Sequence, residues 1–415
     1  MFEVGLKAFL RSLIKAGSLT LIWHDGRTEN FGSGEPHVAI RVRHRRFARR
    51  VILNPPLAVG QCYMDGDFTV EDGTIETFMD LLFLNTGWGY GHWFLETLHW
   101  VQKTGKRLFE HNPVYRSKRN VAHHYDLNDD FYDLFLDSRR QYSCAYFMTP
   151  DDHLEAAQEQ KLRHIAAKLL LKPGMRVLDV GCGWGGLAMY LAQTAEIHVT
   201  GITLSKEQLK VAQERAREAG LGARAEFRLQ DYREVAERYD RIVSVGMFEH
   251  VGTNHYRQFF TKMRDCLEED GVALLHSIGR ADGPSVTNQW IRKYIFPGGY
   301  SPALSEVLPA IERAELFATD IEILRLHYAE TLKHWLHRLW AQRTEVAEIY
   351  DERFCRMWEF YLSASEAVFR RGGHMVFQIQ MSWKVDSVPM TRDYMFDWER
   401  GQGRMPVRKR LDRIA

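Results

Sequence analysis

The sequence predicts an α/β protein with two domains: a larger one built on a doubly wound parallel sheet and a smaller N-terminal α+β domain. Three observations support this prediction. The 415 residues exceed the usual size of a single core. A glycine-rich turn directly follows a short apolar segment at Arg176–Gly186, and from His153 onward helix-like and strand-like segments alternate regularly. The sequence before residue 106 has a different texture, so the domain boundary falls in the polar connection 106–120.

The N-terminal domain, residues 1–105, is expected to mix helices and strands. An amphipathic helix is predicted over Val4–Lys15, and the runs LTLIW and HVAIRV are typical of strands. Asn54-Pro55-Pro56 interrupts the chain, and a further helix is expected around Glu76–Leu84. A tryptophan- and glycine-rich segment, GWGYGHWFLETLHW, precedes the linker.

The catalytic domain is predicted over residues 121–390. Its expected helices cover 154–171, 186–193, 206–219 and 256–267, and its expected strands centre on Val177, 197–202, 225–229, 241–245 and 272–278. Mostly helical residues, Ala281–His374, interrupt the sheet as a lid or substrate wall. The aromatic segment YIFPGGY and the region around Trp335 and Trp340 suit either a substrate channel or ordinary core. A C-terminal extension, 391–415, either packs on the core or supplies a dimer contact.

The turn RVLDVGCGWGG carries the first chemistry. Gly181, Gly183 and Gly185 let the backbone turn tightly and approach a ligand closely. The carboxylate of Asp179, just before the turn, suits a cationic ligand better than a pyrophosphate, and no GK[ST] follows as in a P-loop. We therefore predict a Rossmann-like domain that binds S-adenosylmethionine (SAM).

The next two strand ends supply further candidate SAM contacts. Thr203 and Leu204 end the second strand, and Gln208 lies one turn into the following helix, where ribose contacts are expected. After the third strand, Asp231 could meet the adenine amine and Tyr232 could cover the adenine face. Gln208 and Tyr232 can equally be surface and packing residues.

Three ionisable side chains lie in or after the fourth and fifth strands. Glu249 and His250 lie after the fourth strand, at the edge where such folds place reacting groups. His276 stands in an otherwise apolar strand, where a histidine is more often a satisfied core group. Its place beside the strand that delivers Glu249 favours a functional role.

Composition narrows the remaining function classes. Net charge is +1, but Arg41–Arg50 forms a basic cluster that is either a solvated face or an anion-binding surface. Five scattered cysteines argue against a disulfide framework or zinc site and favour a reducing compartment. No apolar run reaches the roughly 18 to 20 residues of a membrane span, and the N-terminus does not read as a signal peptide. We expect a cytoplasmic enzyme without a nucleic-acid partner, since no RNA-binding module is evident.

Six segments together resemble one family: YSCAYF, LDVGCGWGGLA, GITLSKEQ, MFEHVG, HSIG and LHYAETL. They are similar to the cyclopropane fatty acid synthases, including the mycolic acid cyclopropane synthases, strongly over residues 120–375 and loosely through YMDGDF. The resemblance implies SAM contacts at Tyr142, Ser143, Gly181, Gly183, Thr203, Leu204 and Gln208, with Tyr232 near the adenine. It also implies a bicarbonate held by Cys144, Glu249, His276, Tyr328 and the backbone of Ile278, although Cys144 can equally be an inert buried thiol.

The family resemblance implies a reaction and a partner. SAM-dependent methylene transfer to the cis double bond of an unsaturated phospholipid acyl chain would form a cyclopropane ring, through a carbocation that bound bicarbonate deprotonates. The N-terminal domain and the basic cluster favour a phospholipid bilayer as partner, with the enzyme peripheral on the inner membrane face. A homodimer is a further expectation. The alternatives are methyl branching of the acyl chain and an amine N-methyltransferase that uses Glu249 and His276 directly.

Overall fold

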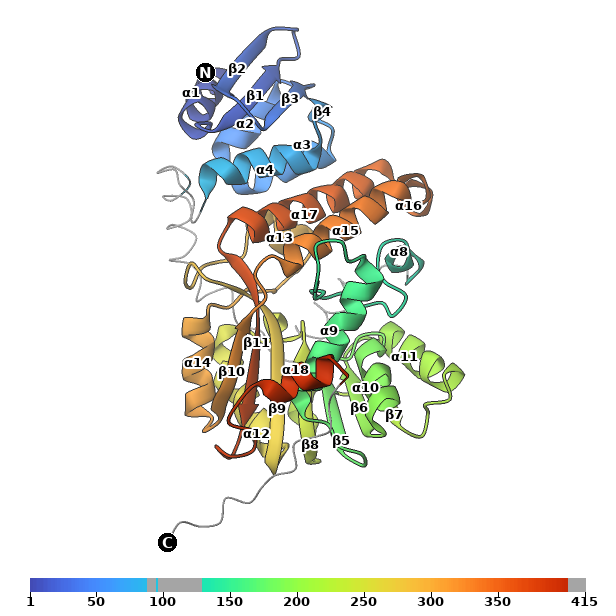
Figure 1. Ribbon diagram of the computed structural model, residues 1–415. Coiled ribbons are helices and arrows are strands. Elements are labelled where there is room, and N and C mark those ends of the chain that lie inside the picture. Colours follow the sequence, from blue (N-terminus) through green and yellow to red (C-terminus); the bar gives the residue numbers. More distant parts are fainter. Residues whose placement is uncertain (88–94, 96–128, 402–415) are drawn as a thin grey trace.

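The computed structural model describes residues 1–87, 95 and 129–401. The predicted linker 106–120 and most of the tryptophan- and glycine-rich segment lie outside these residues. Two sheets, one of four strands and one of seven, organise the described chain, and a layer of helices lies between them (Figure 1).

The N-terminal unit is an α+β fold whose sheet has the order β2-β1-β3-β4. Its elements are α1 (Phe2–Leu13), β1 (Gly17–Ile22), β2 (Thr28–Ser33), β3 (His37–Val42), α2 (Arg46–Leu53), α3 (Pro55–Met64), β4 (Phe68–Asp72) and α4 (Ile75–Thr86). The structure confirms the predicted first helix, both strands and the helix near residue 80. Sequence reasoning missed α2 and α3, which meet at Asn54: α2 ends there and Pro55 occupies the first turn of α3, where no backbone donor is needed.

The larger sheet has the order β10-β11-β9-β8-β5-β6-β7. Its strands are β5 (Arg176–Val180), β6 (His198–Thr203), β7 (Ala225–Leu229), β8 (Tyr239–Val245), β9 (Leu267–Arg280), β10 (Phe317–Ile323) and β11 (His374–Ser382). This confirms the α/β fold and differs from the predicted all-parallel sheet in one strand. β11 follows α17 (Glu352–Arg371) and is antiparallel to both of its neighbours.

Helices cover both faces of this sheet, as a doubly wound fold requires. Val177 of β5 packs with α9 (Leu154–Leu169), α10 (Gly186–Ala195) and α11 (Lys206–Glu218). The next residue, Leu178, packs instead with α12 (Tyr256–Asp265) and α14 (Leu304–Arg313) on the other face. The alternation of neighbouring residues between two cores explains why these strands read as continuous apolar runs.

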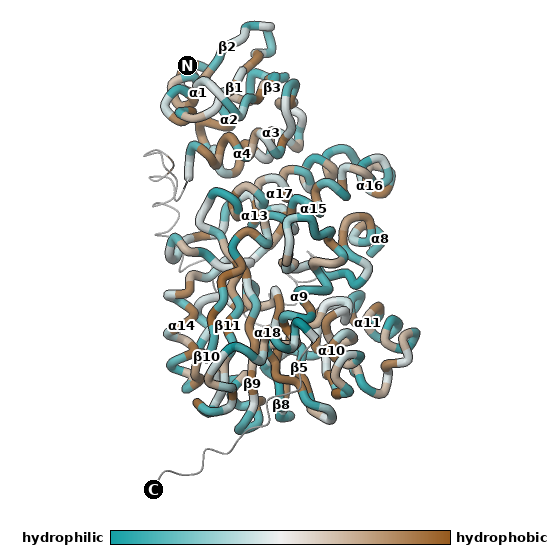
Figure 2. Tube along the Cα trace, in the orientation of Figure 1, coloured by the Kyte–Doolittle hydropathy of each residue, from teal (hydrophilic) through white to brown (hydrophobic). Residues whose placement is uncertain are grey.

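The range predicted as a helical interruption forms a cap over the sheet and also contains β10. The cap helices are α13 (Gln289–Tyr294), α15 (His327–Ala341), α16 (Arg343–Ile349) and α17. α17 contacts α3 and α4 of the N-terminal unit, and buried residues of both parts belong to one continuous apolar cluster. In Figure 2 apolar residues mark much of α4, which faces this cap.

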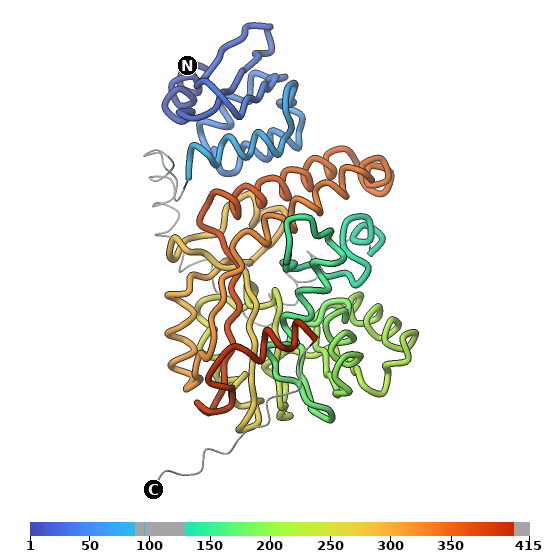
Figure 3. The backbone as a smooth tube through the Cα atoms, in the orientation of Figure 1, coloured from blue at the N-terminus to red at the C-terminus, as the bar shows by residue number. Residues whose placement is uncertain are grey.

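The C-terminal extension begins with α18 (Asp393–Glu399), which packs on α9 (Figure 3, red against green). Tyr394 and Met395 are buried against Ala167. Of the two expectations for this segment, its described part therefore packs on the core. The short helix α8 (Asp129–Asp133) lies before the first predicted SAM contacts.

Candidate functional site

A cavity of about 160 Å³ lies at the carboxyl ends of β5, β6, β7 and β8. It lies at the edge of the sheet where doubly wound folds bind their ligands. All ten residues predicted for SAM line it: Tyr142, Ser143, Asp179, Gly181, Gly183, Thr203, Leu204, Gln208, Asp231 and Tyr232. Val245, Gly246 and His250 also line the cavity. Sequence reasoning did not assign Val245 or Gly246, and it placed His250 among the reacting groups at the end of the fourth strand.

The glycine turn holds the backbone in conformations that side chains disfavour. Gly181 and Gly183 have φ values of 84° and 54°. A Cβ on Gly181 would lie 2.7 Å from the side chain of Met247, whereas Gly183 faces open space. Both glycines line the cavity, so the turn brings bare backbone against any ligand that occupies it.

Asp179 places a buried carboxyl group on the wall of the cavity. Burial raises the pKa of this carboxyl group to about 7, and the nearby positive charge of Lys161 opposes the shift. Its Oδ2 is buried and accepts no hydrogen bond within the described part of the chain. A ligand that carries positive charge would satisfy this oxygen and favour the ionised form.

Lys161 is a site residue that sequence reasoning missed. Its buried Nζ donates to Oε1 of Gln141 at 2.7 Å and to Oγ of Ser143 at 2.8 Å, and so fixes two residues that line the cavity. Burial lowers the lysine pKa to about 8. Helical spacing held a signal, since Leu154, Lys161 and Ile165 recur on one face of α9.

The two predicted nucleoside contacts differ in their surroundings. Oγ1 of Thr203 donates to Oε1 of Gln208 at 3.1 Å, so these two residues are held together on the wall of the cavity. Asp231 accepts two hydrogen bonds from the guanidinium of Arg233, at 2.8 and 2.7 Å. Arg233 thereby fixes the carboxylate that was predicted to meet an adenine amine.

Glu249 follows β8 in a short 3-10 turn, Phe248–His250. Its Oε1 accepts a hydrogen bond from the backbone N–H of Ile278 at 2.6 Å, while its buried Oε2 has no partner among the described residues. Burial raises the pKa of Glu249 to about 7, and hydrogen bonds oppose the shift. A carboxyl group with this pKa can exchange a proton near neutral pH.

The other predicted catalytic residues, His276, Tyr328 and Cys144, make separate contacts of their own. His276 precedes Ile278 by two residues on β9, and its Nδ1 lies 3.1 Å from Nε2 of Gln378. Tyr328, on α15, packs its ring edge-on against Trp335 and Phe369. Cys144 is buried and donates to the carbonyl of Ala145 at 3.2 Å. The structure thus joins Glu249 to Ile278 directly and places Ile278 with Tyr328 at a second cavity.

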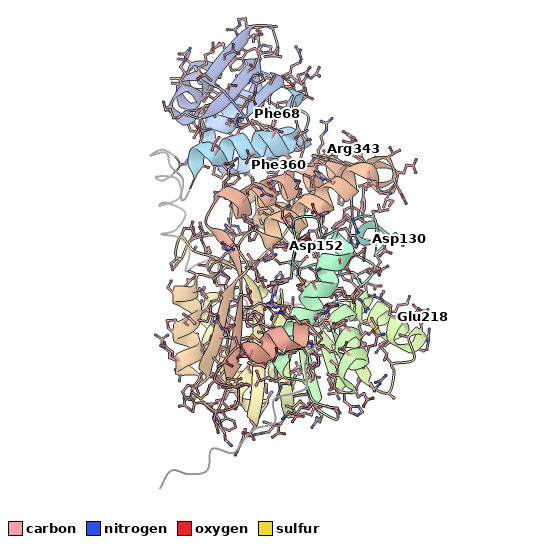
Figure 4. The ribbon with its side chains drawn as sticks, viewed as in Figure 1. Phe68, Asp130, Asp152, Glu218, Arg343 and Phe360 are labelled. Carbon is pink, nitrogen blue, oxygen red and sulfur yellow. The ribbon has the colours of Figure 1, made fainter. Side chains whose placement is uncertain are left out.

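The second cavity is apolar and encloses about 390 Å³ between the N-terminal unit and the cap. α1, α3 and α4 line one side with Leu10, Val59 and Phe83, and the cap lines the other with Phe296, Phe360 and Ala364. Phe360 lies on α17, beside the N-terminal helices (Figure 4). Phe296 and Tyr300 of the segment YIFPGGY line the cavity. Trp335 is instead buried in the core, where its ring stacks on that of Tyr142 with ring centroids 5.1 Å apart.

The two cavities share an aromatic wall. The hydroxyl of Tyr142, which lines the first cavity, lies 3.0 Å from the hydroxyl of Tyr361, which lines the second. The rings of His250 and Phe296 form a similar pair with centroids 6.3 Å apart. Burial lowers the pKa of His250 to about 4, so this wall is uncharged at neutral pH. Tyr361 carried no sequence signal, because it belongs to an ordinary apolar helical pattern.

The basic cluster Arg41–Arg50 is largely neutralised within the N-terminal unit. Arg46 and Arg50 pair with the buried carboxylate of Asp67, and Arg41 and Arg43 pair with Glu71. These pairs favour a structural role for most of the cluster. Two exposed members, Arg45 and Arg49, have no carboxylate partner in the part of the chain that the structure describes.

Within residues 1–87, 95 and 129–401, no helix is both long and apolar enough to span a bilayer. All five cysteines are buried and outside disulfide bonds.

Comparison with known proteins places this site in a family. A family model for mycolic acid cyclopropane synthetase matches residues 113–379. The chain is 39% identical over 357 residues to the cyclopropane-fatty-acyl-phospholipid synthase of Escherichia coli K12, which covers 86% of this chain and 90% of that protein. It is 34% identical over 378 residues to the tuberculostearic acid methyltransferase UfaA1 of Mycobacterium tuberculosis, covering 87% and 86%.

A solved structure agrees. The mycolic acid cyclopropane synthase CmaA1, in complex with SAH and CTAB, superposes with a TM-score of 0.61 at 34% identity, over 66% of this chain and 99% of that one. The matched range contains the glycine turn, the cavity at the strand ends and the Glu249–Ile278 contact. The chain is therefore an enzyme, an S-adenosylmethionine-dependent methyltransferase that belongs to the mycolic acid cyclopropane synthetase family.

Proposed function

We propose that the enzyme transfers a methylene group from SAM to the cis double bond of unsaturated acyl chains in membrane phospholipids and forms a cyclopropane ring. The observation that carries this proposal is the pair of cavities that share an aromatic wall. One is lined by polar side chains and bare backbone among apolar groups, and the other is mainly apolar. A small amine would leave most of the apolar cavity unfilled, so an acyl chain is the better occupant.

The first cavity suits SAM on structural grounds. Oδ2 of Asp179, which has no partner among the described residues, would be satisfied by a cation, and the glycine turn presents backbone without side chains to the cavity. When bound, SAM supplies a strongly electrophilic methyl group. Ser143, which Lys161 orients, and the Thr203–Gln208 pair would fix the cofactor so that this methyl group faces the aromatic wall.

The second cavity would bring the double bond to the same wall. An alkene is a weak nucleophile, so the reaction depends on close approach and on exclusion of water from the cation that forms. The rings of Tyr142, Tyr361 and Phe296 can stabilise positive charge with their faces. Their hydroxyl and ring contacts hold these side chains in place before the acyl chain arrives.

Ring closure requires a base, and Glu249 is the group that can receive the proton. Its pKa of about 7 and its unpartnered Oε2 suit proton exchange at neutral pH. We propose that Cys144, Glu249, His276, Tyr328 and the amide of Ile278 hold a bicarbonate, which supplies a small positioned base. The single N–H of Ile278 donates to Glu249, so a bicarbonate held there would replace that carboxylate oxygen as the acceptor.

We further propose that the enzyme acts as a peripheral protein on the inner face of the cytoplasmic membrane. α1 exposes Phe2 and Val4, and the adjoining α2 exposes Leu53 near the charges of Arg45 and Arg49. Exposed apolar groups beside uncompensated arginines suit an anionic lipid surface. The expected homodimer stays a prediction, which light scattering of the purified protein would test.

Mass spectrometry of lipids tests the central proposal. Incubation with SAM and vesicles of monounsaturated phosphatidylglycerol should add one CH2 and consume the double bond, and NMR of the product should show a ring. The same mass gain with a methyl branch would instead indicate methyl branching. Unchanged lipid together with methylated amines would overturn the lipid assignment, and the Glu249→Gln variant serves as the inactive control.

A further inference from the structure

A chain of buried polar side chains leads away from His276 on the side of β11. His276 and Gln378 are directly opposed on antiparallel strands β9 and β11. Nε2 of Gln378 lies 3.1 Å from Nδ1 of His276, and Oε1 of Gln378 accepts a hydrogen bond from Nζ of Lys168 at 2.7 Å. Lys168 is 1% exposed and belongs to α9. None of these three residues lines the SAM cavity, so a role in binding SAM does not explain their contacts.

Lys168 determines which way the Gln378 amide faces. An ammonium group can only donate hydrogen bonds, so the amide must turn its oxygen toward Lys168 and its NH2 group toward His276. An amide NH2 group can only donate, so Nδ1 of His276 must accept. In a neutral imidazole the proton then lies on the other nitrogen, Nε2.

We propose that Gln378 and Lys168 are positioning residues that fix His276 as the Nε2-protonated tautomer, so that the imidazole donates a hydrogen bond to the anion of the reaction site. This inference rests on the proposed function in one respect, which is that His276 meets that anion. Neither residue touches the reacting groups in this scheme. Each acts through the histidine.

The outer part of the chain of contacts holds Lys168 itself. Glu322 of β10 accepts hydrogen bonds from Lys168 and, at 2.6 Å, from Nε2 of His164. His164 is bridged in turn to Glu399 of α18. Although burial opposes the charge, these donors hold the pKa of Glu322 down at about 2. The buried ammonium is therefore paired, and the C-terminal helix completes the pairing.

The same surroundings keep His276 neutral. Burial lowers its pKa well below the usual value, and the positive charges of Lys161, Lys168 and His164 on α9 act in the same direction. The negative charge of Glu322 on β10 opposes this lowering of the pKa. A neutral histidine with a defined tautomer can donate from Nε2 without competing for the proton that Glu249 is proposed to receive.

Histidine NMR with the isosteric variant Gln378→Glu tests the proposal. A carboxylate can keep the contact with Lys168 but can only accept from His276, so it should draw the proton to Nδ1. In protein labelled with 15N-histidine, and with His276→Asn to assign the signal, the wild-type shifts should show protonated Nε2, and Gln378→Glu should show protonated Nδ1. We expect kcat of this variant to fall about 10²–10⁴-fold while SAM affinity stays within about twofold.

Two further variants separate positioning from stability. Lys168→Met removes the cation that orients the amide, and should give a mixture of tautomers. Gln380→Met is the matched control: Gln380 is a buried glutamine two residues along β11 that donates to the carbonyl of Lys168 and to Tyr394. We expect it to lower the melting temperature and to leave the His276 tautomer and kcat unchanged.

The inference fails if wild-type His276 carries its proton on Nδ1, or if Gln378→Glu leaves the tautomer unchanged. The NMR measurement needs neither SAM nor lipid. Wild-type protein that is inactive on unsaturated phospholipid would therefore count against the proposed function alone, and the tautomer result would still decide this inference.

Discussion

The two cavities of this enzyme differ in what builds them. The smaller one, about 160 Å³, is made from strand ends and turns of one sheet, with fixed polar groups and bare backbone. The larger one, about 390 Å³, is made from apolar side chains of helices in both parts of the molecule. The first can recognise a ligand atom by atom, whereas the second selects by volume and by exclusion of water. Single substitutions in the first cavity should therefore change activity or SAM affinity strongly, whereas substitutions in the second should change activity in proportion to the volume they fill.

The largest effect should come from Glu249, which precedes His250 of the smaller cavity in the chain and accepts a hydrogen bond from Ile278 of the larger cavity. Glu249→Gln keeps the shape and an acceptor for the Ile278 amide but removes the base. We expect turnover to fall by about 10³-fold or more while SAM affinity, measured by calorimetry, is retained. A folded variant with wild-type turnover would exclude Glu249 from the reaction, and loss of SAM binding would assign it to the cofactor.

The same substitution should stabilise the protein at high pH. Because the folded pKa of Glu249 is raised from 4.5 to about 7, folding takes up a proton between these values, and stability falls as pH rises through this window. At pH 8 the ionised Glu249 lowers the free energy of unfolding by about 3 kcal/mol, and the glutamine variant avoids this loss. Below pH 4.5 the wild-type carboxyl group is protonated, so the variant should have no such gain in stability. Denaturant titrations at both pH values would show it, and an equal gain at both would contradict the burial of this charge.

Filling the apolar cavity should produce the next largest effect. Ala364→Phe adds a ring to the wall formed by α17 and takes volume that the acyl chain would fill. It should lower kcat/KM for phospholipid vesicles about 10- to 100-fold, which corresponds to about 1.4–2.8 kcal/mol. SAM affinity should not change. Ala341→Phe, at the exposed end of α15, is the matched control. Equal activity of both variants would show that the acyl chain does not use this cavity.

Asp179→Asn should weaken the cofactor cavity by a smaller factor, about tenfold in the Kd for SAM. In the wild type the carboxyl pKa of about 7 means that the ionised, cation-binding form grows as pH rises from 6 to 8, so SAM affinity should rise over that range. Calorimetry of the asparagine variant should give a flatter pH dependence. A wild-type affinity that does not vary with pH would contradict this role.

The smallest effect concerns the membrane surface, outside both cavities. Arg49→Gln removes one uncompensated charge of about 1 kcal/mol near an anionic bilayer, so vesicle binding should weaken about fivefold. Arg217→Gln, on the exposed face of α11 in the catalytic domain, is the control and should have no effect. Sedimentation with phosphatidylglycerol vesicles at low salt would measure both, and equal binding would remove Arg49 from the membrane argument.

Most of the predicted residues of the smaller cavity could be found because they lie at or just after a strand end, whereas Tyr142 and Ser143 were implied only by the family resemblance. Gly181, Thr203 and Asp231 illustrate this, and all line the cavity. The larger cavity and the wall could not be predicted, since Tyr361 meets Tyr142 from 219 positions away and belongs to an ordinary apolar helical pattern. Gln378 could not be predicted as the partner of His276 for the same reason, because 102 positions separate the two residues.

Helical periodicity could have predicted the two buried lysines of α9 (Leu154–Leu169). Lys161 and Lys168 fall on the face of α9 that also carries Leu154 and Ile165, and an interior lysine signals a polar partner on another element. The basic cluster shows the opposite case. Its charge suggested a binding surface, whereas local pairing with Asp67 and Glu71 accounts for most of it.

The position of β11 between β9 and β10 has a consequence for biosynthesis. β10 leaves the ribosome before β11, yet it cannot join the sheet until β11 has been inserted beside β9. His276 is synthesised 102 residues ahead of Gln378, an interval on the order of 5–20 s during translation. The nascent enzyme therefore waits for almost its whole length before the sheet can close, and a chain truncated ahead of β11 would expose the edge of β9 to aggregation.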